Sequence, residues 1–92
     1  MIKLISYIQD ASPNILYHWL KYYFDFLKVS SGHIFLHSSN KELTELCLNY
    51  IKKYDISVSI ENKYSSKYKN EVISNYVKTL DYGSWCISPD LD

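Results

Sequence analysis

The sequence predicts an α/β fold in which four parallel strands form one open sheet covered by helices. Four short extended runs alternate with three helical patterns along the chain, and strands that alternate with helices in this way pair in parallel. The 92 residues suffice for one domain, residues 1–92, and leave no room for two. Because the connection between two parallel strands is right-handed, only a few strand orders are possible. We expect the fourth strand either beside the first, giving the order 3-2-1-4 that we favour, or beyond the third.

The first strand and helix are predicted from residues 3–32. Lys3 to Ile8 is rich in β-branched and aromatic residues, as strands are. Ser12 is a good N-cap and Pro13 fits the first helical position. Residues 28–32 are then predicted as the turn that ends the helix. The helix should face the sheet with the apolar residues that recur at helical spacing, which are Leu16, Trp19, Leu20, Tyr23 and Leu27.

The second strand is predicted at His33 to His37. Ser39 and Glu42 have the spacing of a capping box, which predicts the start of a second helix. Its apolar stripe is Leu43, Leu46, Cys47, Tyr50, Ile51 and Tyr54. Ile56 to Ile60 alternates with a period of two, which is typical of a half-buried strand.

The third helix follows a polar stretch, residues 61–70. Ser65 or Ser66 can cap it, and Gly83 is a plausible terminator. Its apolar face is Val72, Ile73, Tyr76, Val77 and Leu80. Trp85 to Ile87 is predicted as a short fourth strand, ended by Pro89, which cannot donate to a ladder.

Composition excludes several classes of function. All ten basic residues are Lys, and ten acidic residues balance them. Without Arg or a basic surface, a dedicated nucleic-acid reader is disfavoured. No apolar run approaches the ~20 residues that a membrane-spanning helix needs, and the opening residues are too short for a signal peptide, so we expect a cytoplasmic protein. Cys47 and Cys86 lie in apolar runs, which predicts buried, reduced thiols, although a disulfide remains an alternative.

The clearest chemical signal is the triplet Asp90-Leu91-Asp92. Residues two apart in an extended stretch point to the same side, so both carboxylates should face one way and Leu91 the other. Open parallel sheets bind ligands at the carboxyl ends of strands where the strand order reverses. We therefore expect the triplet to meet Gln9 and Asp10, after the first strand, in an acidic crevice that suits Mg²⁺ or Mn²⁺. A solvated acidic tail is the alternative.

Other candidates are weaker. His33 and His37 lie on one face of a strand but too far apart for an easy zinc clasp, and His18 is expected on the surface. Ser38 and Ser39 open the second helix, whose free N–H groups could receive an anion, although capping is the preferred interpretation. The two glycines of the chain cannot form the Gly-rich loops of dinucleotide oxidoreductases or P-loop NTPases.

The first helix, residues 12–27, has aromatic residues on two faces. Tyr17 and Phe24 lie roughly opposite the stripe that should face the sheet. This pattern predicts that the helix contacts a missing domain or a second copy of the chain.

Three runs of the sequence point to a known family. They are His18 to Tyr23 (HWLKYY), Gly32 to Leu36 (GHIFL) and Trp85 to Asp92 (WCISPDLD). Together they resemble glycosyltransferases of the GT-A fold, and most closely the family-2-like group, whose members carry a Trp-x-x-Tyr-Tyr-like helix and an Asp-x-Asp-Glu-Phe-like motif. The resemblance spans nearly all of the chain but only the N-terminal, Rossmann-like half of such an enzyme.

The resemblance implies that the chain binds a nucleotide-diphospho-sugar. Asp90 would face the ribose and the metal, Asp92 would ligate Mn²⁺ or Mg²⁺, and Gln9 and Asp10 would border the base. Ser38 is a further candidate for cofactor binding. The family often places an Asp just after the second strand, where it contacts the base. In this sequence the second strand ends in HSSN, residues 37–40, which contains no Asp.

The resemblance also implies that the C-terminal half of such an enzyme, with its catalytic base, would lie beyond Asp92. We therefore expect an inactive N-terminal portion of a glycosyltransferase that transfers a sugar to an acceptor hydroxyl. The alternative is a non-catalytic α/β module that assembles through its first helix.

Overall fold

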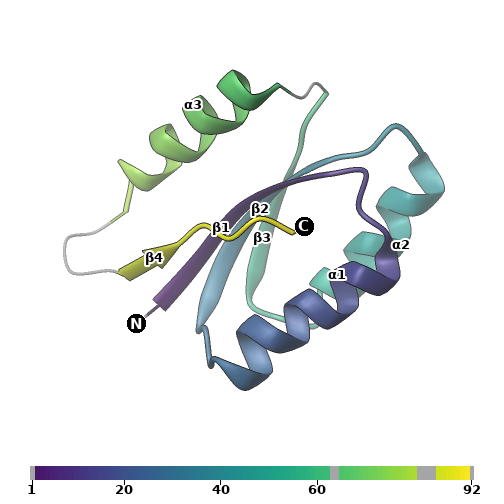
Figure 1. Ribbon diagram of the computed structural model, residues 1–92, viewed down its shortest axis with the longest axis horizontal. Helices are drawn as coiled ribbons and strands as arrows, with labels where there is room; N and C mark the ends of the chain where they lie inside the picture. Colours follow the sequence, from purple (N-terminus) through teal and green to yellow (C-terminus); the bar gives the residue numbers. More distant parts are fainter. Residues whose placement is uncertain (1, 63–64, 81–84, 92) are drawn as a thin grey trace.

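The computed structural model describes residues 2–62, 65–80 and 85–91, and it contains four strands and their connecting helices (Figure 1). The elements follow the order β1 (Ile2–Gln9), α1 (Pro13–Leu20), the π-helical η1 (Lys21–Phe26), β2 (Ser31–His37), α2 (Lys41–Ile51), β3 (Ile56–Ile60), α3 (Ser66–Val77) and β4 (Trp85–Ile87). All strands pair in parallel and the sheet has the order β3-β2-β1-β4. The predicted fold class and strand order are confirmed.

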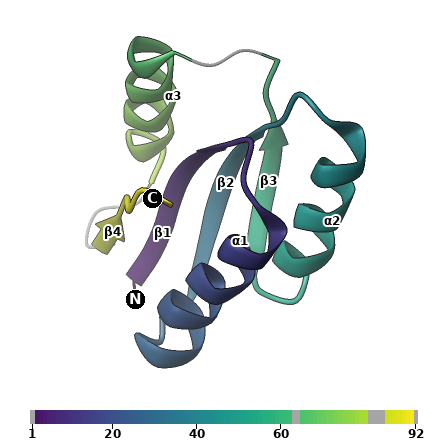
Figure 2. The same cartoon turned by 45° about the vertical axis from the view of Figure 1, so that its right-hand side comes forward.

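Helices cover both faces of the sheet. α1 and α2 lie on one face and α3 crosses the other (Figures 1 and 2). Since strand side chains alternate between faces, β1 and β2 contribute to two separate apolar clusters. The larger cluster, with Leu4, Ile8, Ile34 and Leu36, packs beneath α1 and α2. The smaller cluster, with Ile5, Tyr7 and Phe35, packs beneath α3.

The first helix changes its winding halfway along. η1 continues α1 as a π-helix over Lys21–Phe26, and each wider turn shifts the following residues around the axis. As a result Phe24, predicted to face outward, is buried with 8% exposure, whereas Leu27, predicted on the inward stripe, is 42% exposed. Tyr17 is half-buried, with its ring centroid 5.4 Å from that of Tyr50. The prediction of an outward Tyr17–Phe24 pair is therefore wrong.

The second helix is capped one residue later than predicted. Asn40 is the N-cap, and its side chain accepts hydrogen bonds from the N–H groups of Glu42 (2.9 Å) and Leu43 (3.3 Å). Ser39 cannot form the predicted capping box, because its hydroxyl donates to Asp10 instead. For the third helix, Ser65 accepts from Tyr68 N–H, which confirms one of the two predicted caps. Gly83 lies outside the described residues.

β2 begins earlier than predicted. Ser31 and Gly32 belong to the strand rather than to the preceding turn. Gly32 pairs with Leu4, and a Cβ atom at this position would lie only 2.5 Å from the Leu4 carbonyl oxygen. The absence of a side chain therefore allows the two central strands to approach closely.

The two cysteines differ. Cys47 is buried, as predicted, and burial raises the pKa of its thiol. Cys86 is exposed, contrary to the prediction, because β4 is a three-residue strand at the edge of the sheet. Both thiols are free. Within the described ranges, no helix is long and apolar enough to cross a membrane.

Candidate functional site

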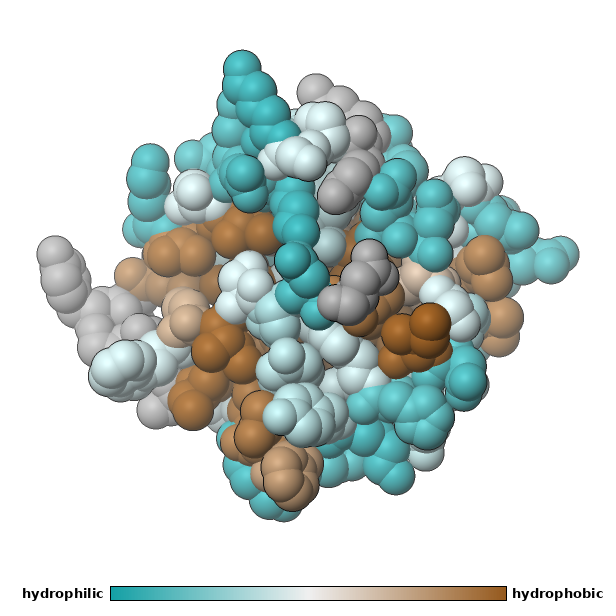
Figure 3. Space-filling view, viewed as in Figure 1, coloured by the Kyte–Doolittle hydropathy of each residue, from teal (hydrophilic) through white to brown (hydrophobic). Residues whose placement is uncertain are grey.

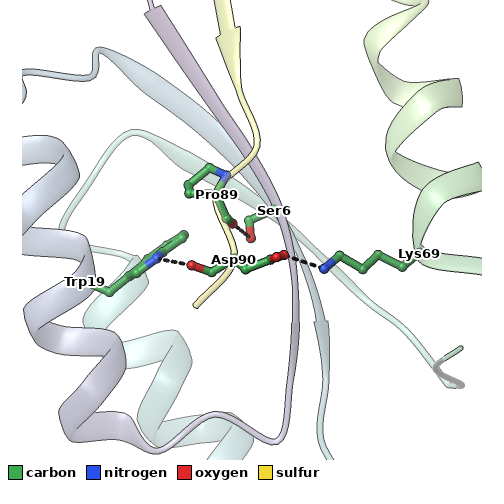
Figure 4. A network of polar contacts seen from close by, with 5 residues as sticks. All are labelled: Ser6, Trp19, Lys69, Pro89 and Asp90. Atoms are coloured by element: carbon green, nitrogen blue, oxygen red, sulfur yellow. Dashed lines mark hydrogen bonds and ion pairs between the residues drawn. The ribbon is translucent and has the colours of Figure 1, made fainter. Parts of the chain in front are cut away.

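The segment that follows β4 runs along β1 and is held by its backbone. The Pro89 carbonyl accepts a hydrogen bond of 2.8 Å from the Ser6 hydroxyl on β1. The next carbonyl, that of Asp90, accepts one of 3.1 Å from the indole Nε1 of Trp19 on α1 (Figure 4). Two consecutive carbonyls are thus fixed by side chains from different elements, so the position of Asp90 is set by the fold.

The side chains of this segment alternate as predicted. Leu91 packs against the larger apolar cluster, on the side of α1 and α2. The Asp90 carboxylate turns toward α3, where its Oδ1 lies 2.5 Å from Nζ of Lys69 (Figure 4). Asp92 lies outside the described residues, so the predicted convergence of the two carboxylates stays a prediction.

Lys69 is the site residue that the sequence analysis missed. It precedes Asp90 by 21 positions, so no local pattern links the two residues. The Asp90 side chain is 69% exposed and that of Lys69 is 21% exposed, so one end of the ion pair is open to solvent. A cation that binds Asp90 must compete with this ammonium group.

Asp10 joins the ends of the two central strands. Its N–H donates to the His37 carbonyl at 2.8 Å, and its Oδ1 accepts from the N–H (2.8 Å) and hydroxyl (3.1 Å) of Ser39. The bond from the Ser39 N–H is the main reason why the pKa of Asp10 is lowered; burial of the carboxylate opposes the shift. The backbone of Asp10 has a φ of 46°, a left-handed conformation that Asp tolerates better than most residues. Asp10 is therefore a structural link as well as an exposed carboxylate.

The remaining predicted residues at this edge are positioned as follows. Gln9 is exposed at the end of β1, in register with His37. The Ser38 hydroxyl donates to the Asn40 carbonyl at 3.0 Å and accepts from the Asn40 N–H at 3.2 Å. Ser38 thus stabilises the turn before α2 but does not cap the helix, whose N-cap is Asn40, so the capping interpretation is wrong for Ser38 as well as for Ser39.

The structure brings the Asp90 segment to β1, but not to its tip. Pro89 is bonded to Ser6, so the parallel register puts Asp90 beside Tyr7. Asp10 lies three residues further along the chain, a distance of about 10 Å at the usual strand rise. Asp10 and Asp90 therefore do not converge on one small ion. A ligand that contacts both must be elongated.

The strand histidines are not arranged as metal ligands. Both ring nitrogens of His33 are hydrogen-bonded, Nδ1 to Ser57 Oγ (2.5 Å) and Nε2 to Ser59 Oγ (2.8 Å), and the ring stacks on Tyr76. Burial lowers the pKa of His33, and the Glu61 charge partly opposes this. His37 Nδ1 is buried without a partner in the described part of the chain. Among the same residues, no group of three or more His, Cys, Asp or Glu could hold a metal ion. His18 is exposed, as expected.

A cavity of about 230 Å³ lies at the other end of the sheet, under α3. It is lined by residues at the starts of β1 and β2 and before β3, together with Tyr76 of α3. Lys3, Asp55 and the hydrogen-bonded His33–Ser57 pair supply its polar groups. No pattern in the sequence pointed to this cavity.

Comparison with known proteins adds no assignment. No protein-family model matches the chain, and neither a curated protein nor a solved structure matches it significantly.

Proposed function

We propose that this chain is the nucleotide-diphospho-sugar-binding portion of a metal-dependent glycosyltransferase. The observation that carries the proposal is the position of Asp90. The chain delivers this carboxylate beside β1, at the point where the strand order changes direction between β1 and β4. Open parallel sheets bind ligands in the crevice at such a reversal. The resemblance of the sequence to GT-A enzymes adds the class of ligand.

The carboxylates of Asp90 and Asp92 fit a divalent cation that is also bound by the phosphates of a ligand. Mg²⁺ and Mn²⁺ prefer oxygen ligands, and Mg²⁺ is often bound by one or two carboxylates together with substrate phosphates. Asp90 would supply one carboxylate and Asp92 the other. The bound cation would neutralise charge on the diphosphate. The chain's own contribution is to hold the Asp90 segment through backbone carbonyls, so that the carboxylate can exchange its Lys69 partner for a cation while the segment stays in place.

Lys69 gives the proposed site a second cationic group. Its ammonium pairs with Asp90 in the free protein, and ammonium groups also bind phosphate as point charges. When a diphosphate and its cation bind, Lys69 would exchange the Asp90 carboxylate for a phosphate oxygen. This exchange keeps both charged side chains paired before and after binding.

The elongated shape of a nucleotide-diphospho-sugar suits the separation of the candidate residues. The diphosphate would lie at Asp90, and the nucleoside would extend toward Gln9 and Asp10, which lies about 10 Å further along the direction of β1 by the strand rise. Ser38 lies in the turn after the neighbouring strand, and its hydroxyl would be at the edge of the base subsite.

Isothermal titration calorimetry with UDP and GDP, with and without Mn²⁺, tests the proposal. We expect binding of one of the two nucleotides that strengthens at least tenfold with Mn²⁺ and is lost in Asp90→Asn. Glu71→Gln is the matched control, because Glu71 is an exposed acidic residue on α3. Absence of Mn²⁺-dependent binding, or equal binding by wild type and Asp90→Asn, would refute the proposal.

A further inference from the structure

The end of the sheet opposite the candidate site exposes large hydrophobic side chains. The most exposed are Trp85 (74%) at the start of β4 and Phe26 (72%) at the end of η1. Trp85 pairs in register with Ile2, so their side chains share one face of the sheet. Ser30 donates from both its N–H and its hydroxyl to the Ile2 carbonyl, which places the segment after η1 at this strand end. We define the apolar end as Ile2, Tyr22, Phe26, Leu27 and Trp85.

The apolar end is a feature of the fold rather than a loose tail. The rings of Tyr22 and Phe26 stack on each other, with centroids 5.7 Å apart and planes 23° apart. The π-helical winding of η1 directs these residues outward while Phe24 turns into the core. Figure 3 shows some hydrophobic side chains at the lower left of the molecule, among paler and more polar ones. Gathered apolar side chains on a surface mark a site of interaction.

Several lysines lie at the same end of the sheet as the apolar side chains. Exposed lysines lie in the turns that lead into β2 and β3, and Lys3 lies near the start of β1; the turn lysines are Lys28, Lys52 and Lys53. Among the residues that the structure describes, the acidic side chains at this end are Asp25, whose carboxylate accepts from the Tyr54 hydroxyl, and Asp55. The chain has no net charge, so the excess of lysine here results from how the fold distributes charge.

We propose that the apolar end docks on an anionic lipid surface. Trp and Tyr rings settle at the boundary between headgroups and acyl chains, and partly inserted apolar side chains add to binding while lysines interact with anionic headgroups. Charge favours lipid over a second copy of the chain, because a symmetric dimer through this end would bring the same lysines together. In this orientation the candidate site, at the other end of the strands, faces the aqueous phase. The proposal does not depend on the nucleotide-sugar proposal.

Tryptophan fluorescence can test the docking directly. Trp85 is exposed and Trp19 is buried, so insertion should shift the emission of Trp85 alone to shorter wavelength. We expect a blue shift and co-sedimentation with vesicles of phosphatidylcholine and phosphatidylserine (70:30), and weak binding to phosphatidylcholine alone. Trp85→Phe should abolish the blue shift.

Paired variants separate the contribution of the apolar side chains from that of the lysines. Phe26→Ser should lower the partition coefficient, whereas Leu46→Ser, an exposed leucine on α2, should not. Each of Lys28→Gln and Lys53→Gln should lower the partition coefficient for the anionic vesicles roughly fivefold. Lys67→Gln, on α3 away from this end, should leave the partition coefficient unchanged.

Three results would overturn the proposal. The first is no blue shift and no co-sedimentation with the anionic vesicles. The second is equal binding to the neutral vesicles that is insensitive to salt. The third is a dimer in sedimentation velocity that forms without lipid and is abolished by Phe26→Ser, since a second copy would then cover the apolar end.

Discussion

Replacing Ser6 with Ala tests whether the fold fixes the Asp90 segment. Ser6 is 1% exposed, and its hydroxyl donates to the Pro89 carbonyl at 2.8 Å. The substitution removes one hydrogen bond and leaves the carbonyl without its donor. β4 pairs with β1 at only three positions, so this bond is a large part of what holds the chain beyond Ile87 against the sheet.

The expected loss of stability follows from burial. A net hydrogen bond contributes about 1 kcal/mol, and an acceptor left unpaired in the interior costs ~1–3 kcal/mol. Pro89 is half-buried, so water can reach its carbonyl in part. We therefore expect the free energy of unfolding to fall by about 1–2 kcal/mol in Ser6→Ala. With an m-value of roughly 1 kcal/mol/M in urea, the midpoint should fall by about 1–2 M.

Urea unfolding, followed by tryptophan fluorescence, measures this change. Ser30→Ala is the matched control, because Ser30 also donates to a β1 carbonyl, that of Ile2 at 2.9 Å, but at an exposed position. We expect a change below about 0.5 kcal/mol there. If nucleotide binds as proposed, Ser6→Ala should also weaken it more than Ser30→Ala does. Equal midpoints for the two variants would show that the Ser6–Pro89 bond does not anchor the segment.

Three further predictions concern other parts of the chain. Gly32→Ala should lower the free energy of unfolding by about 3 kcal/mol in urea titration, because the new Cβ would meet the Leu4 carbonyl oxygen at 2.5 Å and this oxygen belongs to the backbone of a paired strand. The control Ser31→Ala, at the neighbouring position, should change the free energy of unfolding little. Lys69→Met should tighten Mn²⁺ binding about two- to fivefold in calorimetry, since the exposed ion pair competes with the metal, and an unchanged affinity would contradict this. For His33, burial lowers the pKa of the folded state below its usual 6.5, so its stabilising effect is present above pH 6.5 and is lost as the pH falls through the folded pKa. Wild type should lose stability over that range with a slope of at most ~1.4 kcal/mol per pH unit from this group, and thermal melts of His33→Gln should show a flatter dependence.

Much of the fold could be predicted because it depends on regular patterns. The alternation at Ile56–Ile60 and the helical spacing from Leu16 to Tyr23 are repeated signals, and the handedness of crossovers reduces the possible strand orders to a few. The errors lie where one residue competes with another for the same role. Asn40 caps α2 because Ser39 is bonded to Asp10, in the turn after β1. That partner cannot be identified from the local sequence.

The π-helical winding is a second limit on pattern analysis. A regular period of 3.6 residues places Leu27 inside and Phe24 outside, and the wider turns of η1 reverse this assignment. The aromatic residues that remain outside, Tyr22 and Phe26, are the ones on which the proposed docking surface depends. A pattern that assumes one period thus misplaces both Phe24 and Leu27.

Lys69 shows how far the candidate site could have been derived without coordinates. The order 3-2-1-4 with right-handed crossovers places α3 on the face opposite α1 and α2, and alternation places Asp90 and Leu91 on opposite faces. If Leu91 packs with the larger cluster, Asp90 must then turn toward α3. This reasoning selects the helix but not the residue, because the pairing depends on how far α3 is displaced along its axis, and an α-helix rises 1.5 Å per residue. A displacement of one turn would present Ile73 to Asp90 in place of Lys69, so packing beneath α3 determines whether the carboxylate has a cationic partner.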